Sequence, residues 1–195
     1  MAEFDWKAVL EDFNSTLLAD PEICQYAEPT AVSSRWFGFP PASDQQVAAA
    51  ESRLEVSFPP SYRQFLMITN GWRMTGWQSI GVLPVLDVDW LRNRDPELIE
   101  IWCDVDVEEI EDDEYFVYGD AQDCLSMRRE YLQDVLLIST PSWANQDYFF
   151  LNPKIVFEGE WEAWHFSTEF PGACRYRSFY DLMLAELHGV KNYRF

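Results

Sequence analysis

The chain has 195 residues and carries 34 acidic against 14 basic side chains, a formal net charge of −20 at pH 7. So negative a surface repels phosphate backbones and anionic lipids, which argues against direct nucleic-acid or membrane binding and favours basic protein partners. The other explanation of this charge is that it serves only solubility or suits a salt-rich cell. Apolar residues make up 48% of the sequence, enough for one domain with a sizeable core.

The N-terminus has no basic segment followed by an apolar run, so no signal peptide is expected. No window approaches the ~20 apolar residues that a membrane-spanning helix needs. The cysteines Cys24, Cys103, Cys124 and Cys174 are widely spaced and form no C-x-x-C pair. We therefore expect a cytoplasmic protein with free thiols.

Helical spacing of apolar side chains predicts a first helix that is capped by Asp5 and continues to about Leu17. Asp20-Pro21 ends this helix, because the residue before a proline avoids the helical region. Residues 21–42 are expected to form a connector with one short turn.

A capping box, in which Gln46 follows Ser43 by three residues, predicts the start of the next helix. Pro59-Pro60 interrupts it, and Pro60 suits the first position of a further helix. Asn70-Gly71 supplies the left-handed residue expected at the end of that second helix.

From Trp72 onward the pattern is mostly that of strands. Asp95-Pro96 predicts one short helix among them, and Ser178 caps a last helix that ends at Gly189. This order predicts an α+β fold, with N-terminal helices packed on a mainly antiparallel sheet and a C-terminal helix. Strands are predicted at 77–85, 115–118, 135–139 and 148–151, and a hairpin from 155–157 and 161–166.

An acidic run occupies residues 104–114, where eight of eleven side chains are carboxylates. A solvated loop is one interpretation, and a calcium site is disfavoured because no glycine supplies the sharp turn of a D-x-[DN]-x-[DN]-G loop. A partner-facing patch is the third, since a dense negative surface speeds and orients encounter with a basic protein. The candidate partner-binding residues are Asp104, Asp106, Glu108, Glu109, Glu111, Asp112, Asp113 and Glu114.

The search for catalytic groups is mostly negative, so no enzyme, cofactor or metal site is predicted. Of the two histidines, His165 lies in a strand-like segment and favours a structural role, and His188 lies near a helix end. A Cys174–His165 pair remains open, because such partners meet only in space. Glu160 and Glu162 share a face of a strand, which fits either acid–base hydrolysis or a solvent-facing strand edge. Tryptophans left exposed would anchor an interface.

The stretch Glu51–Trp72 combines the end of a helix, L-x-V, a proline pair, S-Y-x-x-F-L and N-G. Later segments at 136–139, 150–153, 159–164 and 171–179 follow in a matching order. Together these motifs resemble the SUKH superfamily of Smi/Knr-type proteins, named partly for a fungal cell-wall-assembly regulator.

The resemblance covers roughly residues 35–187 and implies an α+β domain without catalytic residues. It places a SUKH-like domain at 35–195, with residues 1–34 as a helical arm of the same globule. Glu55 departs from the pattern, because the family usually has glycine there. A residue with a side chain either accepts a strained left-handed conformation or ends the helix differently.

Bacterial members of this superfamily are similar to immunity proteins that neutralise a cognate polymorphic or contact-dependent toxin, often a nuclease. We therefore expect an immunity protein, monomeric or weakly dimeric, that occludes the active site of a basic toxin through the acidic run. The alternative is a non-catalytic regulator or scaffold, as in fungal members. A hydrolase that uses Glu160 and Glu162 is the third hypothesis.

Overall fold

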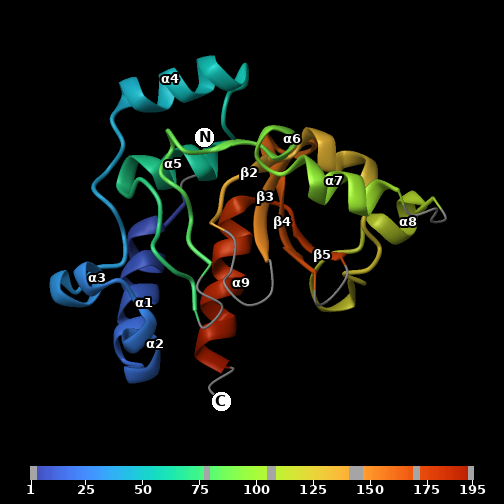
Figure 1. Cartoon of the computed structure of the whole chain (residues 1–195). Helices are drawn as coiled ribbons and strands as arrows, with labels where there is room; N and C mark the ends of the chain where they lie inside the picture. Colours follow the sequence, from blue (N-terminus) through green and yellow to red (C-terminus); the bar gives the residue numbers. More distant parts are fainter. Residues whose placement is uncertain (1–3, 77–79, 105–108, 141–146, 169–171, 193–195) are drawn as a thin grey trace.

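The computed structural model describes residues 4–76, 80–104, 109–140, 147–168 and 172–192. Within these residues, five strands form one sheet in the order β1-β2-β3-β4-β5, and every neighbouring pair is antiparallel (Figure 1). The predicted α+β fold is therefore confirmed. The strands are β1 (Asp89–Trp90), β2 (Leu136–Leu137), β3 (Tyr148–Phe157), β4 (Glu160–Ser167) and β5 (Gly172–Tyr176).

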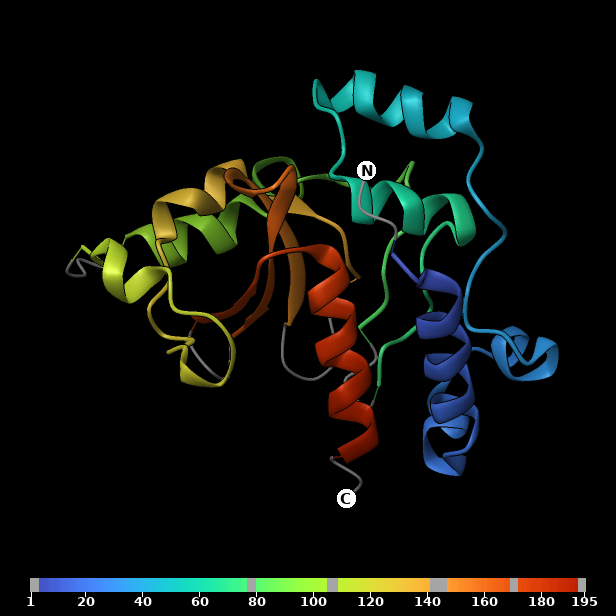
Figure 2. The ribbon, with the colours of Figure 1, turned by 180° about the vertical axis from the view of Figure 1, so that it is seen from behind.

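Helices precede, interrupt and follow the strands, and they cover both faces of the sheet (Figure 2). The α-helices are α1 (Trp6–Leu18), α2 (Pro21–Tyr26), α3 (Pro29–Ser34), α4 (Asp44–Leu54), α5 (Pro60–Ile68), α6 (Leu91–Arg94), α7 (Pro96–Cys103), α8 (Asp112–Tyr115) and α9 (Phe179–Asn192), and the 3-10 helices are η1 (Gly119–Ala121) and η2 (Arg129–Asp134).

Two hydrophobic clusters lie on opposite faces of the sheet because successive strand side chains alternate. Phe149 and Leu151 of β3 belong to the larger cluster, which α1, α4, α5 and α9 complete. Phe150 of β3 and Trp164 of β4 belong to the second, which α6, α7 and η2 cover. Burial of each such side chain contributes about 1.5–3 kcal/mol, so the sheet is held from both sides.

The predicted helix starts are confirmed. The Asp5 carboxylate accepts a hydrogen bond from the Ala8 N–H at 3.1 Å, and Ser43 and Gln46 form the capping box of α4. Pro60 opens α5, as its fixed backbone angle favours. The end of α5 differs from expectation, because Thr69 is already extended and the left-handed residue, Gly71 (φ 102°), comes two positions later.

The predicted connector at 21–42 is wrong, because it contains α2 and α3. Both helices begin with a proline, and the Asp20 side chain accepts hydrogen bonds from the first N–H groups of α2. Asp20-Pro21 therefore ends one helix and caps the next. A proline that stops one helix is equally suited to the first position of another.

Three strand predictions also need correction. Tyr115 ends α8, so the predicted strand at 115–118 is absent from the described chain. In 80–85, only Val82 makes isolated bridges, and residues 77–79 lie outside the described part. The strand predicted to end at 151 continues through a register shift between Asn152 and Val156 into the predicted hairpin. The helix α9 also passes through Gly189 rather than ending there.

Candidate partner-binding surface

The described part of the acidic run forms an exposed ledge at one end of the molecule, around α8 and opposite α3 (Figures 1 and 2). Every described carboxylate of the run is exposed. Asp106 and Glu108 lie outside the described residues. We define the acidic ledge as Asp104, Glu109, Glu111, Asp112, Asp113 and Glu114.

Arg128 holds the ledge in place from its buried side. Its guanidinium donates two hydrogen bonds to the Ile110 carbonyl, at 3.1 and 2.8 Å, and forms an ion pair with Asp112 at 2.6 Å. It also lies 4.6 Å from the ring centre of Tyr115. The Arg128 side chain is only 14% exposed, so these contacts fix the segment more firmly than a surface pair would.

The ledge carboxylates fall into two groups. Asp112 is held by Arg128, and Glu114 accepts a hydrogen bond from the buried Ser126 hydroxyl. Within the described chain, the other four carboxylates form no salt bridge; they are Asp104, Glu109, Glu111 and Asp113. The first pair therefore shapes the ledge, and the other four present uncompensated charge to solvent.

Apolar side chains flank the charges. Ile101 is 66% exposed, Leu125 56% and Phe116 38%. Ile101 also lines a pocket of about 600 Å³ with Glu100, Cys103 and Asp104 at the end of α7. No described tryptophan is exposed, so the exposed apolar groups beside the charges are aliphatic and phenyl side chains rather than indoles.

A buried network joins the ledge to the sheet through Tyr115. Its hydroxyl donates to the Glu162 carboxylate at 2.7 Å, and Arg175 stacks 4.2 Å from its ring centre and donates to its carbonyl. Burial, reinforced by the neighbouring Glu162, raises the pKa of Tyr115, so the phenol stays protonated and remains a donor. The position of α8 is therefore set by β4 and β5.

The expectation of four free thiols is wrong, because Cys124 and Cys174 form a disulfide. The Cα atoms lie 4.7 Å apart although the residues are 50 positions apart in sequence, so spacing alone does not reveal the pair. The bond fastens the segment that carries Ser126 and Arg128 to β5. It also removes the Cys174–His165 pair as a catalytic candidate.

The outer edge of β5 is covered by the same segment. The Ala173 N–H donates to the Cys124 carbonyl at 2.8 Å. The Gln122 side chain accepts a hydrogen bond from the Arg175 N–H at 2.7 Å and donates one to the Arg175 carbonyl at 3.2 Å. These two hydrogen bonds take the place of those that a further strand would form at this edge. Gly172 permits this approach, because a Cβ there would collide with the Cys124 carbonyl.

Glu160 and Glu162 do not form the paired, solvent-facing site considered from the sequence. Glu160 is 9% exposed and accepts a hydrogen bond from the Ser61 N–H, at 2.9 Å. Burial raises its pKa, against the opposing effect of the Ser61 hydrogen bonds. Glu162 is fully buried, and the hydrolase hypothesis fails because no substrate or water reaches both groups. The donors to Glu162 are Tyr115, Tyr118, Asn152 and Trp164.

His165 has the structural role that was predicted for it. Its Nδ1 lies 2.8 Å from a Glu186 carboxylate oxygen on α9. Within the described residues, no cluster of His, Cys, Asp or Glu is arranged to hold a metal ion. No helix of the described chain is long and apolar enough to span a membrane.

The model of the SMI1 / KNR4 family (SUKH-1) matches residues 41–183. The chain belongs to this family. No curated protein matches it. SUKH-1 proteins are generally non-catalytic.

Glu55 shows how this SUKH-1 chain accommodates its departure from the family pattern. The residue ends α4 in the left-handed conformation, with φ 58° and ψ 37°. The helix therefore ends as a glycine would end it, at a cost of about 1–2 kcal/mol for a residue with a side chain.

Sequence reasoning found the acidic ledge but missed the groups that position it, namely Arg128, Ser126 and the disulfide. One feature of the sequence could have pointed to Arg128. Arg128-Arg129 is an adjacent pair of cations in a chain with only 14 basic residues. Nothing local indicated which carbonyl or carboxylate this pair would bind.

Proposed function

We propose that this SUKH-1 protein is an immunity protein that binds a cognate toxin domain one-to-one through the acidic ledge and occludes its active site. The observation that carries the proposal is the set of exposed, unpaired carboxylates on Glu109, Glu111 and Asp113, held on a segment that Arg128 fixes from below. A preformed negative surface costs little ordering entropy when a partner docks.

The chemistry of a nuclease toxin supports this choice of partner. A nuclease active site must be basic to hold phosphates, so it attracts the ledge by the same field that attracts its substrate. The apolar Ile101, Leu125 and Phe116 supply contact area beside the charges, which charge attraction alone does not provide.

Co-expression with the toxin domain encoded beside this gene tests the proposal. We expect the wild-type protein to restore growth and the variant Glu109→Gln/Glu111→Gln/Asp113→Asn to lose most of this protection. These changes leave the Arg128–Asp112 and Ser126–Glu114 contacts in place, so the ledge keeps its shape and loses only charge.

The matched control neutralises three exposed acids on other parts of the surface. Glu11→Gln/Glu22→Gln/Glu158→Gln changes the net charge by the same amount and should protect as the wild type does. Equal protection by both variants would reject the ledge as the contact, and the absence of any toxic neighbour would reject the immunity function.

A regulatory or scaffold function is the second candidate. A second pocket, lined by Arg53, Arg92 and Lys154, favours it, because a scaffold needs surfaces for chemically different partners. This function predicts that the protein captures endogenous proteins in a cell from which the neighbouring toxin gene has been deleted.

A further inference from the structure

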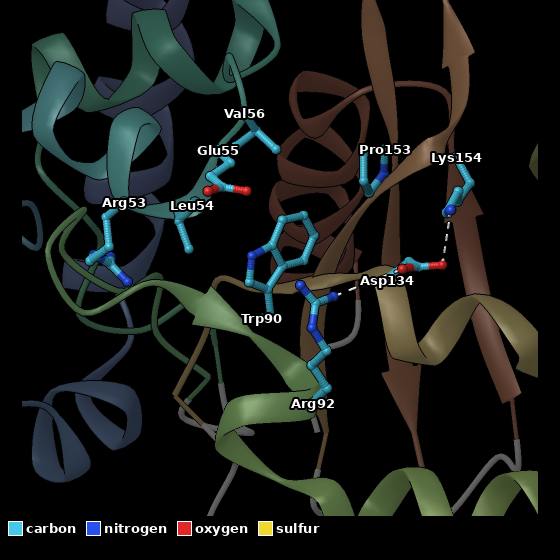
Figure 3. A pocket seen from close by; sticks show the side chains of 9 residues that line it. All are labelled: Arg53, Leu54, Glu55, Val56, Trp90, Arg92, Asp134, Pro153 and Lys154. Atoms are coloured by element: carbon cyan, nitrogen blue, oxygen red, sulfur yellow. Dashed lines mark ion pairs between the residues drawn. The ribbon is translucent and has the colours of Figure 1, made fainter.

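A pocket of about 580 Å³ lies at the β1 edge of the sheet, away from the acidic ledge (Figure 3). The C-terminal end of α4, the edge strand β1, the helix α6 and the middle of β3 surround it. Its volume is within the range of ligand and side-chain pockets. We call it the edge pocket, and its lining residues are Arg53, Leu54, Glu55, Val56, Trp90, Arg92, Asp134, Pro153 and Lys154.

The edge pocket reverses the charge balance of the chain. Among the lining residues the cations outnumber the carboxylates by three to two, whereas the whole sequence has 34 acidic and 14 basic residues. Arg53 forms an ion pair with Asp89 at 3.9 Å, so the excess of positive charge lies where Arg92 and Lys154 share the one carboxylate of Asp134. The pocket at the ledge, by contrast, is lined by carboxylates without a cation. The edge pocket is therefore a place where an acidic group meets local attraction on a protein that otherwise repels it.

Trp90 forms the apolar centre of the edge pocket. It is half-buried against the larger hydrophobic cluster, and the Arg92 guanidinium lies 4.5 Å from its ring centre. Figure 3 shows the ring between Glu55 and Asp134. A rigid, partly exposed indole of this kind is a frequent anchor of protein interfaces.

Two irregular features of the backbone meet at the same pocket. Glu55 holds a left-handed conformation that costs a residue with a side chain about 1–2 kcal/mol. The register shift of β3 between Asn152 and Val156 brings Pro153 and Lys154 to the pocket rim. Strained residues and β-bulges are enriched at binding sites, and here they coincide with the charge reversal.

Two backbone groups at the edge strand are already hydrogen-bonded to side chains of this protein. The Val88 carbonyl accepts a hydrogen bond from Arg53 at 2.7 Å, and the Trp90 N–H donates to the Asp89 carboxylate at 2.8 Å. A partner therefore gains little by adding a strand at these groups. Recognition at this edge must use side chains.

We propose that the edge pocket binds an acidic segment of a partner protein, which places an aromatic side chain against Trp90 and a carboxylate between Arg92 and Lys154. Asp134 now holds both cations, at 3.8 Å from Arg92 and 3.1 Å from Lys154. These side chains are 40% to 52% exposed, so the pairs are weak and an incoming carboxylate exchanges for one of them at little cost.

The proposal is independent of toxin binding, because the ledge attracts basic partners and the edge pocket attracts acidic ones. The probe is the N-acetylated, C-amidated peptide Asp-Glu-Phe-Asp-Glu, titrated into the full-length ¹⁵N-labelled protein and followed by amide and indole shifts. Peptides with Lys at the four acidic positions, or with Ala at the central Phe, are the matched probes. We expect only the acidic aromatic peptide to shift the signals of the edge pocket.

Charge reversal at the rim tests the contact itself. Lys154→Glu should weaken binding of the acidic peptide at least about tenfold, since it replaces an attraction by a repulsion. The control Lys7→Glu reverses an exposed lysine on α1 and should leave the affinity unchanged. Both variants must keep the dispersed amide spectrum of the wild type, so that loss of binding reports the pocket and not the fold.

Three results would overturn the proposal. The first is that millimolar acidic peptide shifts no signal of the edge pocket. The second is that the lysine peptide binds as tightly as the acidic one, and the third is that Lys154→Glu leaves the affinity for the acidic peptide unchanged. A fourth contradicting result would come from analytical sedimentation. If the wild-type protein self-associates and Lys154→Glu abolishes this association, the occupant of the edge pocket is a second copy of this chain. Peptide binding that persists in Glu109→Gln/Glu111→Gln/Asp113→Asn would support the edge pocket whatever the outcome of the toxin experiment.

Discussion

The Glu160 carboxylate on β4 accepts a hydrogen bond from the Ser61 N–H at 2.9 Å and so caps α5 across a separation of 99 residues. The helix has no cap of its own, because its N-cap residue is Pro59. The carboxylate also sits at the positive end of the helix dipole. A pattern that looks catalytic in sequence is therefore a junction between the helix and the sheet.

Removal of this junction should cost stability. Glu160→Ala leaves the N–H and the hydroxyl of Ser61 without a partner in a buried place, which we expect to lower the free energy of unfolding by about 1–3 kcal/mol. Urea denaturation at neutral pH measures the loss. Glu11→Ala, at an exposed position of α1, should stay within about 0.5 kcal/mol of the wild type. Equal stability of the two variants would show that the cap contributes nothing.

The Cys124–Cys174 bond should be measurable both chemically and thermodynamically. Thiol titration of the unfolded, unreduced protein should detect only Cys24 and Cys103. The double variant Cys124→Ser/Cys174→Ser should lose about 2–4 kcal/mol, because a long loop of the unfolded chain is no longer closed. The control Cys103→Ser, at an exposed free cysteine, should be neutral. Four reactive thiols before reduction would contradict the assignment.

The His165–Glu186 pair should make stability depend on pH. Burial disfavours the imidazolium, but the carboxylates of Glu186 and Asp147 outweigh this effect and raise the pKa of His165 above 6.5. The folded state then binds the proton more tightly than the unfolded state. The stabilising contribution is thus complete below pH 6.5 and is lost as the pH rises through the raised pKa.

Comparison with His165→Gln measures this contribution. The unfolding free energy of the wild type, minus that of the variant, should fall as the pH increases from 6.5. Glu186→Gln should show little of this slope, because the opposing charge is gone. A difference that stays constant between pH 5.5 and 8.5 would mean that the pair does not bind a proton on folding.

Arg128 should determine the local stability of the acidic ledge without determining the stability of the whole fold. Arg128→Ala removes the contacts to the Ile110 carbonyl and to Asp112, so we expect amide exchange at 109–114 to increase at least about tenfold. Exchange in β3 and β4 should change much less. Arg63→Ala breaks an exposed ion pair with Asp44 on the far helices and serves as the control. Unchanged exchange at the ledge would show that other contacts hold it.

Local chemistry made much of the fold predictable. The caps at Asp5 and Ser43, the proline start of α5 and the hairpin of β3 and β4 depend on neighbouring residues, and all of them are confirmed. Errors arose where one residue serves two elements. Pro21 both follows one helix and opens another, and the bulge after Asn152 resembles a strand end.

The candidate site was less predictable, because its supports come from distant parts of the chain. The acidic run is visible as composition, but its anchors Arg128 and Ser126 act across 12 to 18 residues. The disulfide joins positions 50 residues apart, and the Tyr115–Glu162 hydrogen bond spans 47. Pairings of this kind depend on the strand register, which periodicity does not specify.

The most direct test of the account is the association rate between this protein and the toxin domain encoded beside its gene, measured by stopped flow at low and high ionic strength. We predict that Glu109→Gln/Glu111→Gln/Asp113→Asn slows association at least about tenfold at low salt, and that added salt removes most of the difference. The control Glu11→Gln/Glu22→Gln/Glu158→Gln should slow it less than about twofold. Equal rates for the two triple variants would contradict the claim that the acidic ledge is the binding surface.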